Sequence, residues 1–426
     1  MRRVARIIAF VAVSVSIPWT CFAAGFSIFE AGAKALGMGG AFTVQADDPS
    51  AIFFNPAGIA DLEGTQLYLG VSTIFTGTSF AGVDPDPGYG TTGETGTMVF
   101  PPINAYVTWQ FREGLTAGLG IFNAYGLGQY WNDEATFPGR HISYHVDLKT
   151  FYFNPSIAWR AHEKIAIGGG VQAVYSLVDL KQYSQRMDPN GSGMLNVATI
   201  NLEGNSSLDW GGNLGVLVGP FSGLTLGASY RSKVEANVSG DGTFTQVASG
   251  SPQLDAVVSP VLPQNQGIET TVNLPWLLSI GGAYSFKEKW TVEVDFNYFG
   301  WSVFQELEFR FEDPSLDTAR PQGFENVLSI RSGVQYELTA EWDLRGGYYY
   351  DPTPQPTESV SPLLADADRH GVSLGFGYGV EKWVIDAFAL TLIRSERSTD
   401  GLSQDGFNGT YDSFACLFGA NFGYNF

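Results

Sequence analysis

The last sixteen residues, Tyr411 to Phe426, restrict the fold of this chain more than any other stretch. Side chains along a β-strand point alternately to opposite faces. One set here is largely aromatic and includes Phe414, Phe418 and Phe422, whereas the set between them is small or polar. The chain then ends on an aromatic residue without a following turn. A strand with one apolar face and one small, polar face predicts an outer-membrane β-barrel.

The first residues have the order of a secretory signal. Three arginines in the first six residues precede a short apolar run, 7–17, which is followed by small residues around Ala23. This pattern predicts a cleaved signal peptide over residues 1–23. The run is shorter than the roughly 20 residues that a membrane-spanning helix needs, and any other crossing must use strands. We therefore expect a multi-pass protein of a Gram-negative outer membrane.

Acidic residues outnumber basic ones by 43 to 23, and the formal net charge is −20. This balance excludes nucleic acid as a partner, because phosphates are bound by Lys and Arg. Of the two cysteines, only Cys416 lies beyond the predicted signal peptide, which excludes an intrachain disulfide and a thiolate metal site. We expect no metal, no cofactor and no enzyme activity. His141, His145 and Asp147 share one loop and are better explained as surface residues than as a catalytic group.

Alternation with a period of two residues recurs along the chain after Thr65 and predicts strands with two unlike faces. The even number of strands suits a bacterial barrel whose two ends lie on one side of the membrane. Fourteen strands are predicted, at 65–76, 100–111, 115–123, 148–161, 164–180, 206–219, 224–238, 270–286, 290–306, 325–338, 341–351, 369–379, 382–394 and 411–426.

The gaps between these strands alternate between six tight turns and seven long loops. Short periplasmic turns and long extracellular loops are typical of outer-membrane barrels. A soluble propeller or sandwich has no reason to alternate its loop lengths in this way. The gaps thus support an all-β, 14-stranded antiparallel transmembrane barrel over residues 65–426.

Residues 24–64 do not alternate, and a barrel of this width is not filled by its own side chains. We expect this segment to form an N-terminal hatch, or plug, inside the lumen. Charged residues on the predicted inward faces need partners when buried. They are expected to form a salt-bridge network that joins strand to strand and strand to plug, and they are Arg160, Arg231, Glu293, Asp295, Arg331, Glu341, Asp343 and Arg345.

The mature sequence resembles the FadL family of outer-membrane transporters for hydrophobic compounds (OmpP1/FadL/TodX type). The resemblance rests on Ala24-Gly25-Phe26, on Asp47-Asp48-Pro49 and Asn55-Pro56-Ala57 in the plug, on the stretches 123–127, 230–232 and 273–275, and on the ending 421–426. It implies a fourteen-strand barrel closed by an N-terminal hatch, with passive uptake of hydrophobic molecules. It also implies a kink near 123–126 that opens the barrel wall sideways.

The resemblance and the apolar residues of two long loops define the predicted sites. Ligand would be captured at the extracellular loops, passed to a lumen pocket and released laterally. The predicted ligand contacts are Phe26, Tyr125, Leu127, Trp131, Leu180, Lys181, Gln182 and Trp210. The predicted gate and hatch residues are Asn55, Pro56, Ala57, Asn123 and Gly126. Exposed apolar residues on adjacent loops make a landing groove, and the further candidates for it are Tyr130, Phe137, Met187, Met194, Leu195, Val197 and Ile200.

One departure from the family pattern concerns the substrate. Fatty-acid carriers of the family place an arginine and a lysine near the ligand carboxylate, and the corresponding positions here are Gln182 and Glu325. Only the neighbouring Lys181 is left to pair with a carboxylate. We expect long-chain fatty acids as substrates, with neutral aromatic or alkane hydrocarbons as the alternative. An open porin or a surface receptor is the second alternative, and the other expected partners are outer-membrane lipid, lipopolysaccharide and the barrel assembly machinery.

Overall fold

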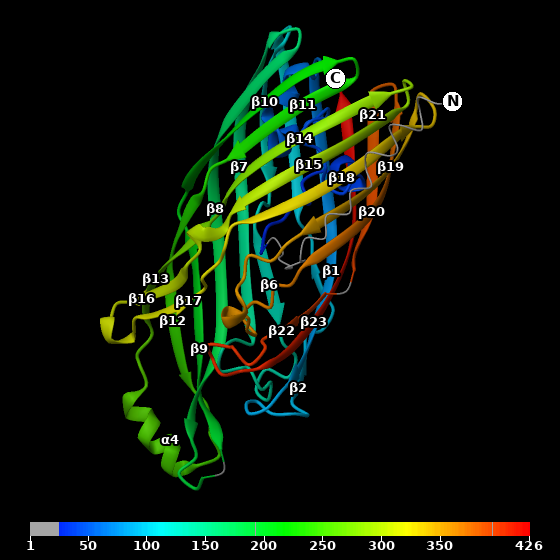
Figure 1. The fold of residues 1–426 in the computed structure, drawn as a ribbon. Helices are drawn as coiled ribbons and strands as arrows, with labels where there is room; N and C mark the ends of the chain where they lie inside the picture. Colours follow the sequence, from blue (N-terminus) through cyan, green and yellow to red (C-terminus); the bar gives the residue numbers. More distant parts are fainter. Residues whose placement is uncertain (1–24, 192, 394) are drawn as a thin grey trace.

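The computed structural model describes residues 25–191, 193–393 and 395–426, so the predicted signal peptide lies outside the described residues. Within these ranges the chain forms a closed barrel of 14 antiparallel strands, which confirms the predicted fold class (Figure 1). No helix in the described ranges is long and apolar enough to cross a bilayer.

Fourteen positions make up the barrel wall, and several of them are filled by two successive strand segments. In chain order the wall consists of β1 (Thr65–Gly82); β3 (Met98–Phe100) with β4 (Ile103–Arg112); β5 (Leu115–Phe122) with β6 (Gly126–Tyr130); β7 (His145–His162); β8 (Ile165–Met187); β9 (Met194–Ser206) with β10 (Asp209–Phe221); β11 (Leu224–Arg231) with β12 (Val234–Gln246); β13 (Gln266–Leu274) with β14 (Trp276–Phe286); β15 (Trp290–Gly300) with β16 (Glu306–Phe311); β17 (Thr318–Pro321) with β18 (Val327–Glu337); β19 (Trp342–Asp351); β20 (Arg369–Val380); β21 (Trp383–Ile393) with β22 (Ser395–Ser398); and β23 (Gly409–Asn425).

The barrel closes where β23 pairs with β1, in an antiparallel register that joins Gln66 to Asn425 and Gly82 to Gly409. The aromatic side chains of β23 lie on the outer surface, where Phe418 is 53% exposed. The intervening residues face inward, and the Asn421 side chain accepts a hydrogen bond from the backbone N–H of Ala33 at 2.8 Å. The last strand therefore has the two faces that its sequence predicts, and its pairing with β1 joins the two ends of the sheet.

Several predicted loops are largely strand. β8 continues past its predicted end, β9 lies within a predicted loop, and Figure 1 shows both projecting with β12 at the end of the barrel opposite the C-terminus. Helix α4 (Pro252–Val258) and the short strand β2 (Thr92–Glu94) lie at the same end. Outward residues there are polar, for example Asp179 and Glu203, which oppose each other on β8 and β9. The prediction stopped at residue 180 and resumed at residue 206 because the outer face of the strands between these positions is no longer apolar.

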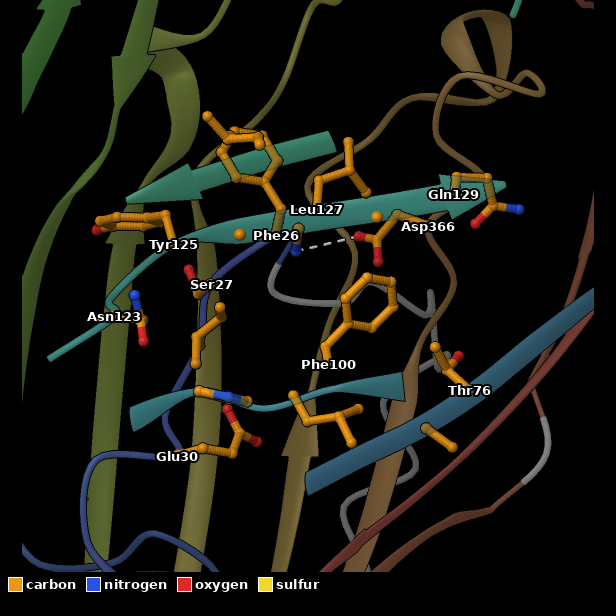
Figure 2. Close-up of a pocket in the computed structure, with 18 of the residues that line it drawn as sticks. Phe26, Ser27, Glu30, Thr76, Phe100, Asn123, Tyr125, Leu127, Gln129 and Asp366 are labelled. Carbon is orange, nitrogen blue, oxygen red and sulfur yellow. Dashed lines mark hydrogen bonds between the residues drawn. The ribbon is translucent and has the colours of Figure 1, made fainter. Parts of the chain in front are cut away.

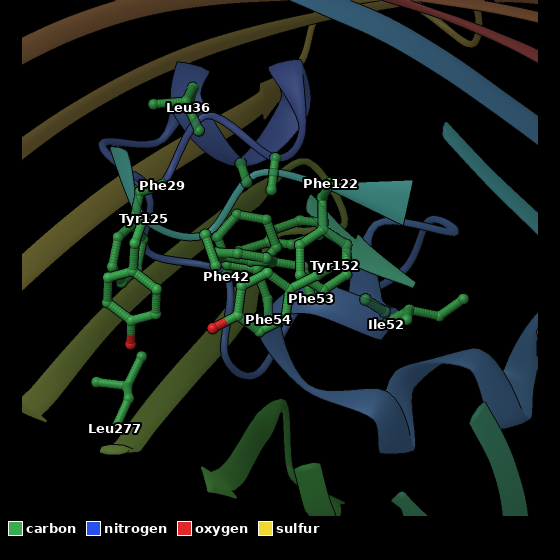
Figure 3. Close-up of a cluster of buried hydrophobic side chains, with 14 of the residues drawn as sticks. Phe29, Leu36, Phe42, Ile52, Phe53, Phe54, Phe122, Tyr125, Tyr152 and Leu277 are labelled. Carbon is green, nitrogen blue, oxygen red and sulfur yellow. The ribbon is translucent and has the colours of Figure 1, made fainter. Parts of the chain in front are cut away.

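Residues 25–64 lie inside the barrel and carry helix α2 (Ala33–Gly37), helix α3 (Ala51–Phe54) and the 3₁₀-helix η1 (Pro56–Asp61). Their buried aromatic rings pack against rings of the wall (Figure 3). The ring of Phe53 meets that of Phe122 edge to face, with the centroids 5.1 Å apart. Edge-to-face contacts of this kind add to the burial of apolar area. The segment is thus held in the lumen by a shared apolar cluster.

The inward charges only partly form the predicted salt-bridge network. Pairs between strands are present, with Arg331 bound to Asp351 and Arg345 bound to Asp386, each at 2.5 Å. Arg160 pairs with Asp61 of the inner segment. Glu341 departs from the prediction, because it is exposed in the turn before β19.

Three other inward charges bind the backbone of the inner segment instead of an opposite charge. The Asp295 carboxylate accepts the N–H groups of Phe42 and Thr43, both at 2.9 Å. The Glu293 carboxylate accepts the next two N–H groups along the chain, at 2.7 and 2.9 Å. The Arg231 guanidinium donates to the Phe53 carbonyl at 2.8 Å. Irregular backbone cannot satisfy its own polar groups, so these side chains take the place of a strand partner.

Candidate functional site

A cavity of about 470 Å³ lies between the start of the inner segment and the wall (Figure 2). Its apolar surface comes from Phe26 and Ile28 of the inner segment, Leu127 of β6, Leu148 of β7 and Phe100 of β3. The polar groups at its edges come from several separate parts of the chain. A mostly apolar cavity with a few polar groups is the usual form of a small-molecule site.

The wall beside this cavity lacks part of its backbone pairing. β4 and β5 pair from Arg112 as far as Asn104, which lies opposite Phe122. Beyond that point β3 pairs with β1, and β6 pairs with β7. No described pairing joins β3 to β6, so the sheet is interrupted between the second and third wall positions. Exposed side chains of β7, such as Lys149, line the same cavity as buried ones, such as Leu148. The cavity therefore extends through the wall at this interruption.

The backbone at the interruption bonds to the inner segment. Between β5 and β6, the Ala124 carbonyl accepts the Ile28 N–H at 2.9 Å, and the Gly126 N–H donates to the Phe26 carbonyl at 3.0 Å. The Asn123 side chain bridges the two edges, since it accepts the Ile103 N–H at 3.1 Å and donates to the Thr150 carbonyl at 2.6 Å. The start of the inner segment thus replaces the missing strand neighbour.

A second, smaller cavity of about 60 Å³ lies next to the first one. Leu180 of β8, Phe309 of β16 and Leu363 line it, together with Phe26 and Leu127, which also line the larger cavity. Its lining is almost wholly apolar. Phe26 and Leu127, which are among the shared lining residues, therefore stand between an apolar chamber formed by β8 and β16 and the chamber that reaches the wall.

The charges around the larger cavity are mostly paired with one another. Lys149 and Arg369 are the basic residues among its described lining, and each one contacts a carboxylate: Asp147 at 2.5 Å and Asp366 at 2.8 Å. Glu30 adds a third carboxylate to the lining. Burial raises the pKa of the Glu30 carboxyl, against hydrogen bonds from its own backbone and the charge of Arg331. The lining contains three carboxylates and two cations, and this excess of acidic groups disfavours the binding of an anionic ligand.

Asp366 ties the beginning of the inner segment to the cavity. Its carboxylate accepts the backbone N–H of Gly25 at 3.1 Å, drawn as a dashed line in Figure 2, and the hydroxyl of Thr353 at 2.6 Å. Arg369 donates to the Gly25 carbonyl at 2.8 Å. This one ion pair therefore holds both the N–H and the carbonyl of the same residue.

The structure brings five of the predicted site residues together at the larger cavity: Phe26, Asn123, Tyr125, Gly126 and Leu127. Leu180 lines the smaller cavity. The other four predicted ligand contacts, Trp131, Lys181, Gln182 and Trp210, line neither cavity. The three predicted hatch residues, Asn55, Pro56 and Ala57, are fully or nearly fully buried at the start of η1.

Trp131 and Trp210 line neither cavity. Trp131 is buried, its ring stacks on Phe137 at 4.4 Å, and its indole N–H donates to the Pro362 carbonyl. It packs two loops together and is not part of an exposed landing groove. Trp210 is 64% exposed on the outer surface of β10, because its position in the strand has outward parity.

Lys181 and Gln182 also lie outside both cavities. Lys181 Nζ contacts Asp179 at 3.2 Å on the outer face of β8. Gln182 follows it on the strand, opposite Ile200 of β9. A carboxylate in either cavity therefore does not meet Lys181. The loop methionines that were candidates for the landing groove, Met187 and Met194, are exposed at the tip of the β8–β9 hairpin.

Asn55 positions the η1 turn against the wall. Its amide donates to the Thr43 carbonyl at 2.7 Å and to the Val216 carbonyl of β10 at 3.2 Å, while its oxygen accepts the Ala57 N–H at 3.1 Å. The oxygen of this asparagine caps the first turn of η1, and its amide nitrogen fixes that turn to the wall. Gly215 of β10 faces this side chain, and a Cβ there would collide with it.

Sequence reasoning missed Phe100, Leu364 and the Asp366–Arg369 pair. Asp366 lies at the end of a long gap between strands and Arg369 is the first residue of β20, and no local pattern relates either residue to Gly25. Phe100 had a usable signal, because Pro101 and Pro102 follow it. Proline cannot donate to a sheet ladder, so a proline pair within a predicted strand indicates an interruption of the wall.

A polar cavity of about 270 Å³ lies on the opposite side of the inner segment. Lys34, Asp48, Arg345 and Asp386 are among its lining residues. The Asp48 carboxylate accepts the backbone N–H and the hydroxyl of Ser50, at 2.7 and 2.5 Å. Burial raises the pKa of Asp48 to about 7, although the charge of Lys34 acts in the opposite direction.

Asp48→Asn is expected to stabilise the protein above pH 7. The folded-state pKa of Asp48 lies above its ordinary value of 3.8, so the stability that it contributes falls as pH rises from about 4 to about 7. The asparagine removes this loss, with an upper limit of about 4 kcal/mol at pH 8. The temperature at which the folded electrophoretic band disappears, followed from pH 4 to pH 8, measures the effect. The exposed Glu63→Gln is the control, and equal curves for Asp48→Asn and the unmodified protein would contradict the prediction.

Comparison with known proteins gives consistent matches over nearly the full length. A family profile described as outer membrane protein transport protein (OMPP1/FadL/TodX) matches residues 14–426. The long-chain fatty acid transport protein of Escherichia coli O6:H1 is 25% identical over 448 residues and covers 97% of both chains. The 47 kDa outer membrane protein of Pasteurella multocida is 24% identical over 423 residues, which cover 95% of this chain and 94% of the relative.

Two solved structures share the fold. The crystal structure of a Pseudomonas aeruginosa FadL homologue has a TM-score of 0.82 at 19% identity, and the match covers 95% of this chain and 100% of that one. The P. putida toluene transporter TodX has a TM-score of 0.72 at 18% identity, with 94% and 99% covered. At such identities the likeness concerns the fold.

Proposed function

Because the chain belongs to the outer membrane protein transport family (OMPP1/FadL/TodX), we propose that it carries hydrophobic compounds passively across part of the outer membrane. It is an outer-membrane protein with a 14-strand barrel. The proposed route starts at the extracellular ends of β8 and β16, passes the smaller apolar cavity and then the larger one, and leaves through the interrupted wall.

The observation that carries this proposal is the larger cavity, which reaches the barrel exterior between β3 and β6. Its lining includes the exposed Ile103 on the outer face of β4. A hydrophobic molecule gains free energy by leaving water for an apolar cavity, and again by entering lipid directly. A sideways exit spares it a second passage through water.

An open porin is a weaker proposal, because residues 25–64 occupy the lumen. We propose that these residues, with Ala24, act as the hatch that blocks the axial path. Support comes from Asn55, which bonds to the wall, and from the carboxylates of Glu293 and Asp295, which bind four successive N–H groups. Lipopolysaccharide contact at the exposed extracellular strands, recognition by the assembly machinery and a receptor role of the loops stay predictions.

The charge of the larger cavity favours neutral hydrophobic compounds over long-chain fatty acids. Its two cations already bind carboxylates, and Glu30 adds a further acid. An entering carboxylate would lose its hydration without gaining a free cation, and burying an unpaired ion is costly. Fatty acids remain the second candidate, because relatives across the whole chain are named long-chain fatty acid transport proteins.

Methyl dodecanoate is expected to bind the purified barrel about tenfold more tightly than dodecanoate at pH 8, since about 1.4 kcal/mol of unfavourable charge burial gives this ratio. Displacement of radiolabelled toluene from the detergent-solubilised protein measures both affinities. Glu30→Gln removes one carboxylate from the cavity and is expected to reduce the difference in affinity between methyl dodecanoate and dodecanoate. Tighter binding of the acid than of the ester would make fatty acids the favoured substrates.

Uptake itself is tested in a Gram-negative host that lacks its own transporter of this family. Cells that make this protein are expected to take up radiolabelled toluene faster than cells with an empty vector. Equal rates in the two strains, with the folded barrel present in the outer membrane, would contradict the transport proposal.

A further inference from the structure

We propose that Phe100 is a movable shutter in the barrel wall, and that its ring sets the width of the lateral exit. This inference rests on the proposed function, because a shutter needs a compound to pass. Phe100 is the last residue of β3, directly before Pro101 and Pro102. Figure 2 shows its ring directed toward the β6 segment that carries Leu127 and Gln129.

The ring of Phe100 closes the space that the backbone leaves open. β3 pairs with β1 and β6 with β7, so no described backbone ladder joins β3 to β6, and the Tyr130 N–H of β6 donates to the Met98 sulfur of β3 at 3.3 Å. A Cβ built on Gly128 of β6 would collide with the end of the Phe100 ring. The ring therefore fits against the bare backbone of a glycine, and its centroid lies 5.9 Å from that of Tyr130.

The position of Phe100 coincides with the point where the cavity meets the outer surface. Phe100 and Gly128 both line the larger cavity. So do Ile103 and Lys149, which are exposed on the outside of the barrel. A molecule that moves from the cavity into lipid at this interruption must pass the Phe100 ring.

The ring can swing aside without breaking a backbone hydrogen bond in the gap. Pro101 and Pro102 have no N–H group to donate, and Gly128 has no side chain that would hold the ring from the far side. Phe100 is partly exposed, and rotation of an exposed side chain is fast compared with strand separation. Opening by rotation of one side chain therefore has a far lower barrier than unzipping the wall.

Two probes of different width test the shutter, toluene and the wider pyrene, in the uptake assay described above. Phe100→Ala is expected to raise the initial rate of pyrene uptake about fivefold, which corresponds to about 1 kcal/mol of barrier, and to change toluene uptake much less. Phe100→Trp is expected to lower pyrene uptake. Adding Gly128→Leu to Phe100→Ala refills the gap from the other strand and is expected to return pyrene uptake to the original rate.

The controls separate a shutter from a general effect on structure. Phe418→Ala removes an exposed aromatic ring of β23 outside the cavity and is expected to leave both rates unchanged. Because Phe100 also lines the cavity, the pyrene affinity of each purified variant is measured as well, and a change in affinity as large as the change in uptake rate would overturn the shutter. An unchanged ratio of pyrene to toluene uptake across the Phe100 variants would overturn this inference alone. Failure of the unmodified protein to take up either probe would overturn the transport proposal along with it.

Discussion

Replacing Asp295 by alanine is expected to convert the closed barrel into an ion-conducting one. The substitution leaves the buried N–H groups of Phe42 and Thr43 without an acceptor, and each unsatisfied group costs about 1–3 kcal/mol. Together this loss of about 2–6 kcal/mol weakens the contact between residues 25–64 and β15. Single-channel recording in planar bilayers is expected to show stepwise conductance that the unmodified protein lacks.

Two matched variants define the scale of this effect. Asp295→Asn keeps one carbonyl oxygen in nearly the same place, so its conductance is expected to be much smaller than that of Asp295→Ala. Deletion of residues 25–61 removes the inner segment and sets the maximum conductance. A deletion variant that folds and still does not conduct would show that this segment is not the axial barrier.

The second large effect is expected for Gly347→Ala. Gly347 of β19 faces the inner segment, and a Cβ there would collide with the backbone of Met38 and Gly39. Backbone cannot move aside as the end of a flexible side chain can, and forcing extra volume into a packed contact costs about 1–3 kcal/mol. We expect a lower melting temperature and the appearance of conductance, because the segment around α2 can no longer seat against β19.

The adjacent Gly346→Ala is the control for this prediction. Gly346 lies on the same strand with opposite parity, and the nearest atom to its added Cβ is 3.9 Å away. Its melting temperature and conductance are expected to equal those of the unmodified protein. Equal behaviour of the two alanine variants would contradict the close contact between β19 and the inner segment.

Much of the barrel could be predicted from local patterns. Alternation of apolar and polar residues marks strands wherever one face meets lipid, as in β23. The pattern failed beyond the membrane, where β8 and β9 carry polar residues on their outer face. The apolar residues there face inward instead, as Leu180 and Leu202 do, so the pattern of an apolar outer face no longer marks the strand. Several loops are therefore shorter than predicted, although tight turns and longer connections alternate along the chain as predicted.

The site was predictable only where the resemblance supplied it. Phe26, Tyr125 and Leu127 meet at the larger cavity, whereas Trp131 is buried between loops and Trp210 faces outward. An aromatic side chain in a long loop has the same sequence pattern whether it packs or binds. Only its neighbours in space distinguish the two roles.

The terminal strand, Tyr411 to Phe426, shows what the sequence determined by itself. Its alternating aromatic and small residues specify a membrane-facing and a lumen-facing side, because both preferences act on each residue separately. Only the tertiary structure decided what the lumen side binds. The Asn421 side chain accepts a hydrogen bond from the Ala33 N–H, and the Asp366 carboxylate accepts one from the Gly25 N–H. In both cases more than three hundred residues of chain separate the partners. Such contacts depend on closure of the whole barrel, so the seat of residues 25–64 against the wall and the pairing of the cavity charges have no local signature.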